Sequence, residues 1–358
     1  MYNSVTIKIG SNVLTRSDSQ LNIERIEHIT EQVAELHKKG VKVILVSSGA
    51  VASGRSVVSL PTKIDSVSSR QVLSAVGQVK LLTTYEKLFE NHGITCAQVL
   101  VTKQDFSTRE HYLNMKNCFS ALLDNNIIPI VNENDAVSIT ALMFTDNDEL
   151  AGLVSSMMNT EALFILSNVN GIYDGDPKNP DSKLIREIDT INTNLEDYVT
   201  TQKSNFGRGG MLTKGRVAIN TAAAGINVHI ANGESKNIIA DLTKNHPEVP
   251  HTFFKADEPK PAVKKWMAYS AGFAPAEVHI NEGAQEALCS DKANSLLLAG
   301  VTKLPDSFQK GDLLKIIGPD KKMIGIGKAQ YDRKKALEHL NSKKYRPLIH
   351  YDYLHLYP

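Results

Sequence analysis

The feature that most constrains the fold is a regular alternation of two hydrophobic periodicities along residues 1–230. Short apolar runs such as Val5 to Ile9 and Val41 to Val46 have the length and β-branched composition of buried strands. Between them, Ile23 to Leu36 places apolar side chains every three to four positions, as a helix with one buried face does. Asn22 is suited to cap that helix and Gly40 to end it.

The same cycle continues along the chain. Further helices are predicted at 69–91, 107–125, 147–158 and 211–224, and further strands at 97–101, 127–131, 162–166 and 228–230. Strands that alternate with helices of this length are joined by right-handed crossovers into a mainly parallel sheet, which helices cover on both faces. The sequence therefore predicts an α/β fold, a three-layer αβα sandwich.

The alternation stops after residue 230. Residues 251–274 include Pro259 and Pro261 among charged side chains, and they predict a linker. Beyond it, short apolar runs separated by turns rich in Gly, Asp and Lys predict strands at 276–280, 295–298, 313–317 and 323–328. The expected organisation is a first domain at 1–250, a linker at 251–274 and a small β-rich domain at 275–358.

Composition excludes several classes of protein. Hydrophobic residues make up 42% of the 358 residues and charged residues 22%, as in ordinary globular proteins. No apolar run approaches the roughly 20 residues that a membrane helix requires, and the first residues lack a signal-peptide pattern. The three cysteines are far apart, which argues against a disulfide framework. We therefore expect a cytoplasmic protein without a membrane partner.

The charge is unevenly distributed. Residues 261–358 carry a formal charge of +5 and residues 1–260 a charge of −4. A mildly basic C-terminal segment suits nucleic acid, although solvated surface lysines give the same count.

Small and polar residues follow four of the predicted strands. They are Gly10-Ser11, Ser48-Gly49, Asn132 to Asp135, and Ser167-Asn168. Ligands of open α/β sheets bind outside the carboxyl ends of the strands. Turns between strands and helices are often rich in Gly, Ser and Asn, but four such turns together favour a ligand site.

Two candidate phosphate-binding features stand out, although the P-loop and the Gly-x-Gly-x-x-Gly fingerprint are both absent. Gly207 to Gly210 precedes a predicted helix with Lys214 in its first turn, and a helix N-terminus favours an anion. Lys8 lies on an otherwise apolar strand, where it either reaches the site or points outward from an edge. The acids between Asp146 and Glu149 either cap a helix or form a carboxylate cluster that orients lysines or holds Mg²⁺.

Taken in order, these segments resemble the amino-acid kinase family over about residues 4–250. The matching motifs are Lys8 to Ser11, Val46 to Ala50, Gln71 to Gln78, Leu122 to Pro129, Asn132 to Asp135, Asp146 to Asp148 and Gly207 to Lys214. Within the family, the chain is most similar to members that phosphorylate glutamate. Residues from about 275 to 350 resemble a PUA domain, an RNA-binding module.

The resemblance implies an amino-acid kinase fold followed by a PUA-like domain, and a defined reaction. The protein would use ATP and Mg²⁺ to phosphorylate the side-chain carboxylate of L-glutamate, giving L-glutamyl 5-phosphate and ADP, the first step of proline biosynthesis. It also implies a homo-oligomer, either a dimer or a tetramer, and RNA as a potential partner of the C-terminal domain.

Site roles follow by the same resemblance. The catalytic residues would be Lys8 and Lys214, which flank the transferring phosphoryl group, and Asp148, which orients them. Glutamate would be held by Ser48, Gly49, Asp135 and Asn147. The nucleotide would be bound by Lys8, Gly10, Ser11, Ser167, Asn168, Arg208, Gly209, Gly210, Met211, Leu212, Thr213 and Lys214. No residue is assigned to a metal, and Asn168 stands where the family usually has Asp.

Two alternatives remain open. One is another amino-acid kinase, acting on aspartate or N-acetylglutamate; the second of these substrates has no ammonium group for Asp135 to bind. The other is an RNA-binding protein with an inactive kinase scaffold, against which the presence of Lys8, Asp148 and Lys214 argues. A carboxylate acceptor is already deprotonated at neutral pH, so two lysines and backbone donors suffice without a general base.

Overall fold

The computed structural model describes residues 1–16, 18, 20–61, 64–107, 109–138, 144, 146–188, 210–244, 248–257, 276–290, 294–340 and 345–356. Its chain divides into two compact units: Met1–Thr102 with Lys116–Pro259, and Lys103–Met115 with Lys260–Pro358. Within the described ranges, no helix is both long and apolar enough to cross a membrane.

Strands and helices alternate along the N-terminal part of the chain, as the periodicities predict. The described strands up to residue 257 are β1 (Ser4–Ile9), β2 (Lys42–Ser47), β3 (Cys96–Val101), β4 (Ile128–Glu133), β5 (Ala162–Ser167), β6 (Glu187–Ile188), β7 (Asn227–Asn232) and β8 (His251–Phe254). The helices are α1 (Ser11–Leu14), α2 (Ile23–Lys38), α3 (Ala50–Arg55), α4 (Ser66–Glu90), α5 (Gln104–Ser107), α6 (Arg109–Asp124), α7 (Asn147–Met158), α8 (Met211–Ala223) and α9 (Ile238–Thr243). Asn22 caps α2 as expected, because its side chain accepts a hydrogen bond from the backbone N–H of Arg25.

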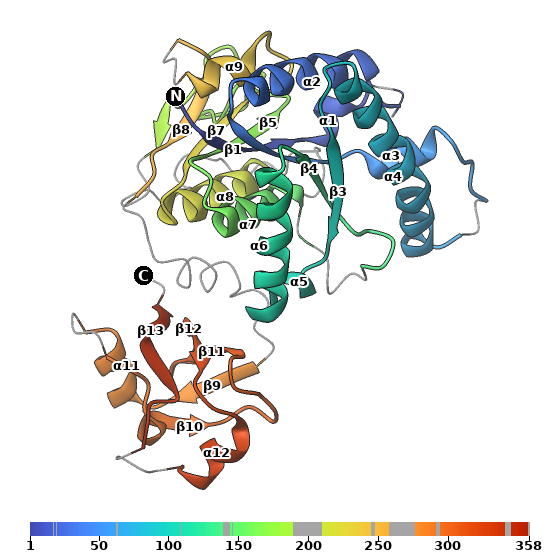
Figure 1. The fold of residues 1–358 in the computed structure, drawn as a ribbon. Helices are drawn as coiled ribbons and strands as arrows, with labels where there is room; N and C mark the ends of the chain where they lie inside the picture. Colours follow the sequence, from blue (N-terminus) through green and yellow to red (C-terminus); the bar gives the residue numbers. More distant parts are fainter. Residues whose placement is uncertain are drawn as a thin grey trace. The chain divides into compact units, whose positions relative to one another are not determined.

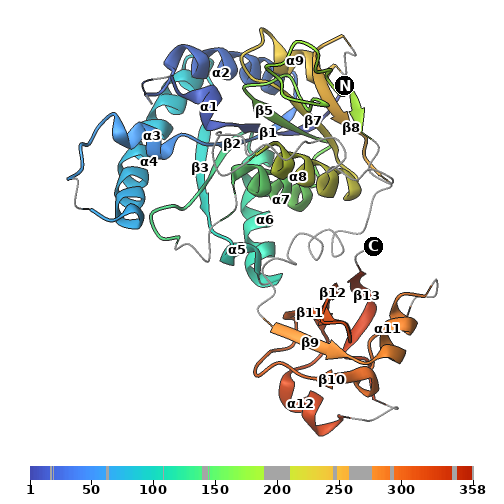
Figure 2. The same cartoon turned by 180° about the vertical axis from the view of Figure 1, so that it is seen from behind.

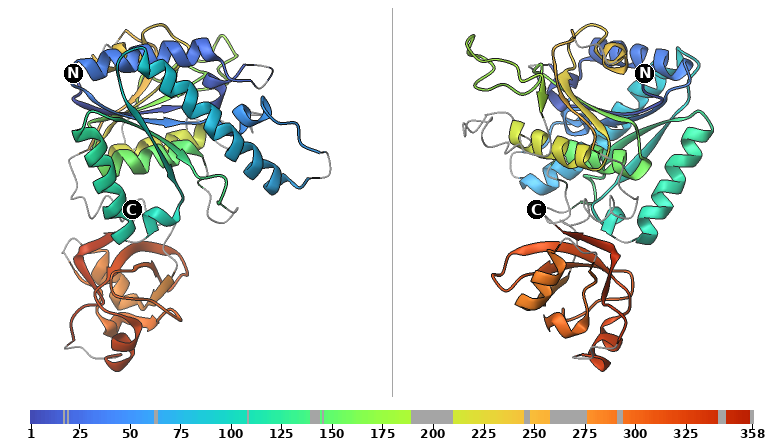
Figure 3. Two further views of the ribbon diagram at one scale, coloured as in Figure 1. Left: turned by 45° about the vertical axis from the view of Figure 1, so that its right-hand side comes forward. Right: turned by 90° about the vertical axis from the view of Figure 1, so that its left-hand side faces the viewer.

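The strands form one eight-stranded sheet in the order β3-β4-β2-β1-β5-β7-β8-β6. Its strand pairs are parallel except for β7 with β8, so the predicted mainly parallel sheet is confirmed. Helices α2 and α9 cover one face and α7 and α8 the other (Figures 1 and 3). The three-layer αβα sandwich is confirmed as well.

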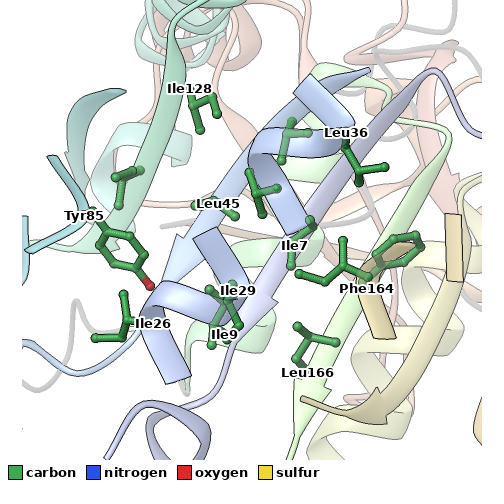
Figure 4. Packing of buried hydrophobic residues seen from close by; sticks show 14 of the residues in the cluster. Ile7, Ile9, Ile26, Ile29, Leu36, Leu45, Tyr85, Ile128, Phe164 and Leu166 are labelled. Atoms are coloured by element: carbon green, nitrogen blue, oxygen red, sulfur yellow. The ribbon is translucent and has the colours of Figure 1, made fainter. Parts of the chain in front are cut away.

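Alternate residues of β1 serve the two faces of the sheet. Val5, Ile7 and Ile9 are fully buried against α2 and α4, in the main apolar core (Figure 4). Helices α7 and α8 lie on the opposite side of the sheet from α2 (Figure 2). Successive side chains of a strand point to opposite faces, so Thr6 and Lys8 face the layer that contains α7. Thr6 Oγ1 lies 3.3 Å from Thr160 Oγ1 just beyond α7, and Lys8 contacts the first turn of that helix.

Two glycines allow α3 and α4 to cross in close contact. A Cβ atom at Gly77 would overlap the carbonyl oxygen of Ala50, and one at Gly54 would overlap that of Leu73. Helix α3 begins immediately after Gly49, whose φ of 105° lies in the left-handed region that glycine adopts without strain. The position of the turn at the end of β2 therefore depends on the packing of α3 against α4.

The C-terminal unit contains a separate five-stranded sheet in the order β10-β9-β11-β12-β13. Its elements are β9 (Ala276–Ile280), α11 (Glu282–Leu288), β10 (Val301–Lys303), β11 (Leu313–Ile317), β12 (Met323–Ala329), α12 (Arg333–Glu338) and β13 (Ile349–Leu356). Its own apolar core includes Val278, Leu314 and Ile316. The small β-rich domain is confirmed as a fold.

Two details of the sequence analysis are wrong. Residues 251–254, assigned to the linker, form β8, which pairs antiparallel with β7 and thus extends the large sheet. Residues 295–298 do not form a strand; Leu296 makes an isolated bridge with Ile349 and a 3₁₀ turn follows at Leu298–Gly300. Residues 255–257 of the expected linker form neither helix nor strand, and residues 258–274 lie outside the described residues.

A buried histidine lies in the large sheet. His229 on β7 is fully buried, and its Nε2 lies 3.0 Å from the hydroxyl of Tyr2. Its ring packs against Phe164, His251 and Phe253. Burial, with a smaller contribution from His251, lowers the pKa of His229 to about 3.

We predict that replacing Gly77 by Ala destabilises the protein. The added methyl group must displace the backbone of α3, and such overpacking costs about 1–3 kcal/mol. The measurement is thermal unfolding of Gly77→Ala beside Gly283→Ala, a control in α11 where an added Cβ meets only ordinary contacts. Equal stability of the two variants would contradict the close crossing.

We predict that His229 makes the fold sensitive to acid. An unfolded histidine titrates near pH 6.5, so between pH 6.5 and about 3 the unfolded chain binds a proton that the folded chain excludes. This contribution to stability is complete above pH 6.5 and falls by up to about 1.4 kcal/mol per pH unit below it. Unfolding of the wild type and of His229→Phe should show parallel pH dependence above pH 7 and a shallower loss for the variant between pH 6 and 4.5. Identical slopes in that acidic range would refute the assignment.

Candidate active site

The carboxyl ends of four parallel strands meet near the centre of the sheet. Strand β1 connects along the chain to β2 on one side and pairs with β5 on the other, which creates the switch point where open α/β sheets bind ligands. The turns there are tied together: Gly10 N donates to the carbonyl oxygen of Leu166 at 3.0 Å, and Ser48 N donates to that of Ile9 at 3.2 Å.

The central feature of the site is one carboxylate between two lysines. Asp148 lies in the first turn of α7, and its side chain is completely buried. Its Oδ1 is 2.6 Å from Lys8 Nζ and its Oδ2 is 2.7 Å from Lys214 Nζ. Lys8 comes from β1 and Lys214 from the first turn of α8, so the carboxylate joins the sheet to both helices of one layer.

Opposing electrostatic effects act on Asp148. Burial raises the pKa of the carboxyl group, but the charges of Lys8 and Lys214 outweigh burial and lower the pKa to about 2. Asp148 is therefore ionised at neutral pH. The two ion pairs fix the ammonium groups of Lys8 and Lys214, whose long side chains would otherwise be free to change rotamer.

A second acid, Asp146, caps α7. Its Oδ1 accepts hydrogen bonds from the backbone N–H groups of Asp148 and Glu149, at 3.0 and 3.1 Å. Burial, and then the neighbouring Asp148 charge, raise the pKa of Asp146 to about 6. Its Oδ2 is buried and has no hydrogen-bond partner within the described part of the chain.

The next residue, Asn147, connects the ends of two strands. Its side-chain nitrogen donates to Ser48 Oγ and to Asn132 Oδ1, both at 3.0 Å. Asn132 in turn donates to Gln78 Oε1 at 3.0 Å. Ser48 and Asn147, both predicted to bind the amino-acid substrate, are thus direct neighbours.

Asp135, the residue predicted to bind an ammonium group, lies in a cluster beside α4. Arg70 Nη2 is 2.7 Å from Asp135 Oδ1 and 3.8 Å from Glu133 Oε2. Ser74 Oγ lies 3.4 Å from Asp135 Oδ2. A cavity of about 310 Å³ borders the cluster, with Ser74, Glu133 and Asp135 in its lining.

Helix α4 therefore contributes polar residues that the sequence analysis did not assign. Arg70, Ser74 and Gln78 are four residues apart, so they share one face of the helix, and that face meets the end of β4. The spacing is visible in the sequence, but three polar residues on a helix indicate a solvent-exposed face as readily as a site.

The residues predicted to bind the nucleotide fall at two helix starts and one strand end. Gly10 precedes α1, whose first residue, Ser11, is exposed. Ser167 is buried at the end of β5, and its hydroxyl donates to Asn168 Oδ1 at 3.4 Å. Gly210 is the N-cap of α8, and its first turn contains Met211, Leu212, Thr213 and Lys214. Arg208 and Gly209 lie outside the described residues.

Comparisons with known proteins identify the family of the chain. The family model described as the amino acid kinase family matches residues 3–232, and the PUA domain model matches residues 276–349. A protein of Bacteroides thetaiotaomicron named glutamate 5-kinase is 49% identical over 99% of this chain and 99% of its own length. A protein of Chlorobaculum tepidum with the same name is 47% identical over 100% of this chain and 98% of its own length.

A solved structure supports the fold independently. The carbamate kinase from Giardia lamblia bound to AMP-PNP superimposes with a TM-score of 0.50, covering 72% of this chain and 99% of the other at 19% identity. The match is to the fold. Together with the family model, which spans well over half of the residues, these findings show that the chain belongs to the amino acid kinase family and that a PUA domain follows its kinase domain in the sequence.

Proposed function

We propose that the protein transfers the γ-phosphoryl group of ATP to the side-chain carboxylate of L-glutamate, giving L-glutamyl 5-phosphate and ADP, the first step of proline biosynthesis. The observation that carries the proposal is the buried Asp148 between Lys8 and Lys214 at the switch point of the sheet. Full-length relatives named glutamate 5-kinase support the choice of substrate.

Charge stabilisation is the main requirement of phosphoryl transfer. The transition state spreads negative charge over the oxygens of the transferring group, so positioned cations and N–H donors lower the barrier. Each lysine ammonium carries a full positive charge and three N–H donors, and Asp148 lies 2.6 Å from Lys8 Nζ and 2.7 Å from Lys214 Nζ. Lys8 and Lys214 would therefore place positive charge at the transferring group while Asp148 holds their positions, and Ser11 and Gly49 would add hydrogen-bond donors. The N–H of Gly10 already donates to the carbonyl oxygen of Leu166, so Gly10 would contribute by letting the backbone approach the phosphate.

The acceptor is held on the side of the site that contains β4 and α4. Ser48, Gly49 and Asn147 would bind the side chain of glutamate, and Asp135 its ammonium group. An acceptor carboxylate is ionised at neutral pH and needs no base. Aspartate is one methylene shorter, so its carboxylate would stop short of the lysines while its ammonium group is bound.

The nucleotide occupies the other side. The N-terminus of α8 favours phosphate through its N–H groups and its dipole. That end of the helix is formed by the N-cap Gly210 and the first helical residues Met211, Leu212 and Thr213. Arg208 and Gly209 would extend this surface, and Ser167 and Asn168 would bind from the end of β5. Asn168 offers a donor where the family's Asp offers a charge.

The site is compatible with Mg²⁺ bound mainly through ATP. The described residues contain no group of three or more His, Cys, Asp or Glu side chains that could hold a metal ion. Mg²⁺ in kinases is typically held by one or two carboxylates together with phosphates and water. Asp146 fits that need, because its Oδ2 is buried without a hydrogen-bond partner within the described ranges. When bound, Mg²⁺ neutralises charge on the β- and γ-phosphates.

The C-terminal unit is proposed to contact RNA. The match to the PUA domain and the formal charge of +5 over residues 261–358 support this second candidate function. A homo-oligomer, either a dimer or a tetramer, is a prediction from the family resemblance, and light scattering tests it. A cytoplasmic location is a prediction from the sequence, and cell fractionation tests it.

The kinase activity is tested by incubating the purified protein with ATP, Mg²⁺ and L-glutamate, and trapping the acyl phosphate with hydroxylamine. We expect hydroxamate with L-glutamate and at most a trace with L-aspartate or N-acetyl-L-glutamate. Lys214→Ala should lower kcat by about 10²–10³-fold because it removes one of two cations at the transferring group. Lys236→Ala, at an exposed position, is the matched control. Hydrolysis of ATP without hydroxamate from any substrate would refute the proposal.

RNA binding is tested by filter binding of tRNA to the full-length protein over a range of salt concentrations. Contacts between lysines and phosphates should make the logarithm of affinity fall linearly with the logarithm of salt concentration. Absence of salt-sensitive binding near physiological ionic strength would exclude this role for the C-terminal unit.

A further inference from the structure

The substrate of the proposed reaction carries three charged groups, and the proposed function assigns partners to two of them. The side-chain carboxylate would lie with Ser48, Gly49 and Asn147, and the ammonium group with Asp135. The α-carboxylate has no assigned partner. It is attached to the same carbon as the ammonium nitrogen, so an ammonium bound at Asp135 brings the α-carboxylate to within a few ångströms of the same acid.

The neighbourhood of Asp135 would repel this carboxylate unless a cation were present. Asp135 and Glu133 are both buried, with exposed fractions of 8% and 5%. The negative charges of these two acids and of the α-carboxylate would repel one another strongly, because water is largely excluded there. Lys8 and Lys214 are both ion-paired with Asp148 and act on the other end of the substrate.

Arg70 supplies that cation. It is ion-paired with Asp135 at 2.7 Å and lies 3.8 Å from Glu133, and about a third of its side chain is exposed. A guanidinium has five N–H donors in a planar fork, so it can keep Asp135 in place with one nitrogen and bind a second carboxylate with others. Its exposed fraction leaves it within reach of a ligand.

We propose that Arg70 binds the α-carboxylate of the substrate, and that Arg70 and Asp135 together recognise the α-amino acid head group. This inference rests on the proposed glutamate kinase function and deepens it. It makes Arg70 a determinant of substrate specificity at one end of the substrate, separate from the lysines at the other.

The test compares L-glutamate with L-isoglutamine, the α-amide of glutamate, which keeps the ammonium group and the side-chain carboxylate but lacks the α-carboxylate charge. Arg70→Gln should raise the KM for L-glutamate about 10- to 100-fold and leave kcat within a few fold. It should leave kcat/KM for L-isoglutamine nearly unchanged, so the preference for glutamate collapses. Arg70→Lys, which keeps the charge and loses the fork, should show a smaller rise in KM.

The controls separate this role from a structural one. Lys87→Gln removes an exposed positive charge from the same helix and should leave both substrates unaffected. A KM for L-glutamate within threefold of the wild type in Arg70→Gln would overturn the inference. So would equal losses for both substrates, because these would mean that Arg70 acts only by positioning Asp135. Failure of the wild type to phosphorylate L-glutamate would instead refute the proposed function itself.

Discussion

The ion pairs of Asp148 with Lys8 and Lys214 are the interaction on which the rest of the site depends. A carboxylate with no exposed surface would be protonated or excluded from the core if it stood alone, and two lysines this close to each other would repel. Each member makes the burial of the others tolerable. The three residues come from β1, α7 and α8, so the ion pairs form only when the sheet and both helices have packed.

This dependence explains why one face of β1 carries polar residues. Ile7 and Ile9 belong to the apolar core on the side of α2, whereas Thr6 and Lys8 alternate with them and meet α7. A strand with both faces buried is normally apolar throughout. The exception at Lys8 lies at the carboxyl end of the strand, where the sheet opens toward the switch point. Burying the Lys8 ammonium there lowers the stability of the fold, but it places a positive charge where phosphoryl transfer needs one.

Much of the kinase fold was predictable because its signals are local and repeated. The strands at β1 and β2, the cap at Asn22 and the parallel order follow from periodicity and from the length of the connections. Strand β8 was missed because four residues followed by prolines and charges resemble a linker, and only pairing with β7 makes them a strand.

Lys8, Asp148 and Lys214 were named from the sequence, and the structure brings them together. Arg70 was not named, because only its contact with Asp135, 65 residues further along the chain, places it beside the site. The resemblance assigned Asp148 to the lysines, whereas the spacing of the acids left open which of them caps the helix, and the structure shows that Asp146 is the cap.

The glycine crossing of α3 and α4 has a consequence for how substrate length is recognised. Gly77 packs against Ala50 and Gly54 of α3, the helix that follows Ser48 and Gly49. Arg70, seven residues earlier on α4, is ion-paired with Asp135. Seven residues of α-helix span about 10 Å and hardly stretch. The residues proposed to bind the side chain of the substrate and those proposed to bind its head group are therefore linked by one rigid helix. On the proposed function, variants that accept a shorter or longer diacid would have to shift the register of α3 on α4, rather than change a single side chain at either end of the substrate.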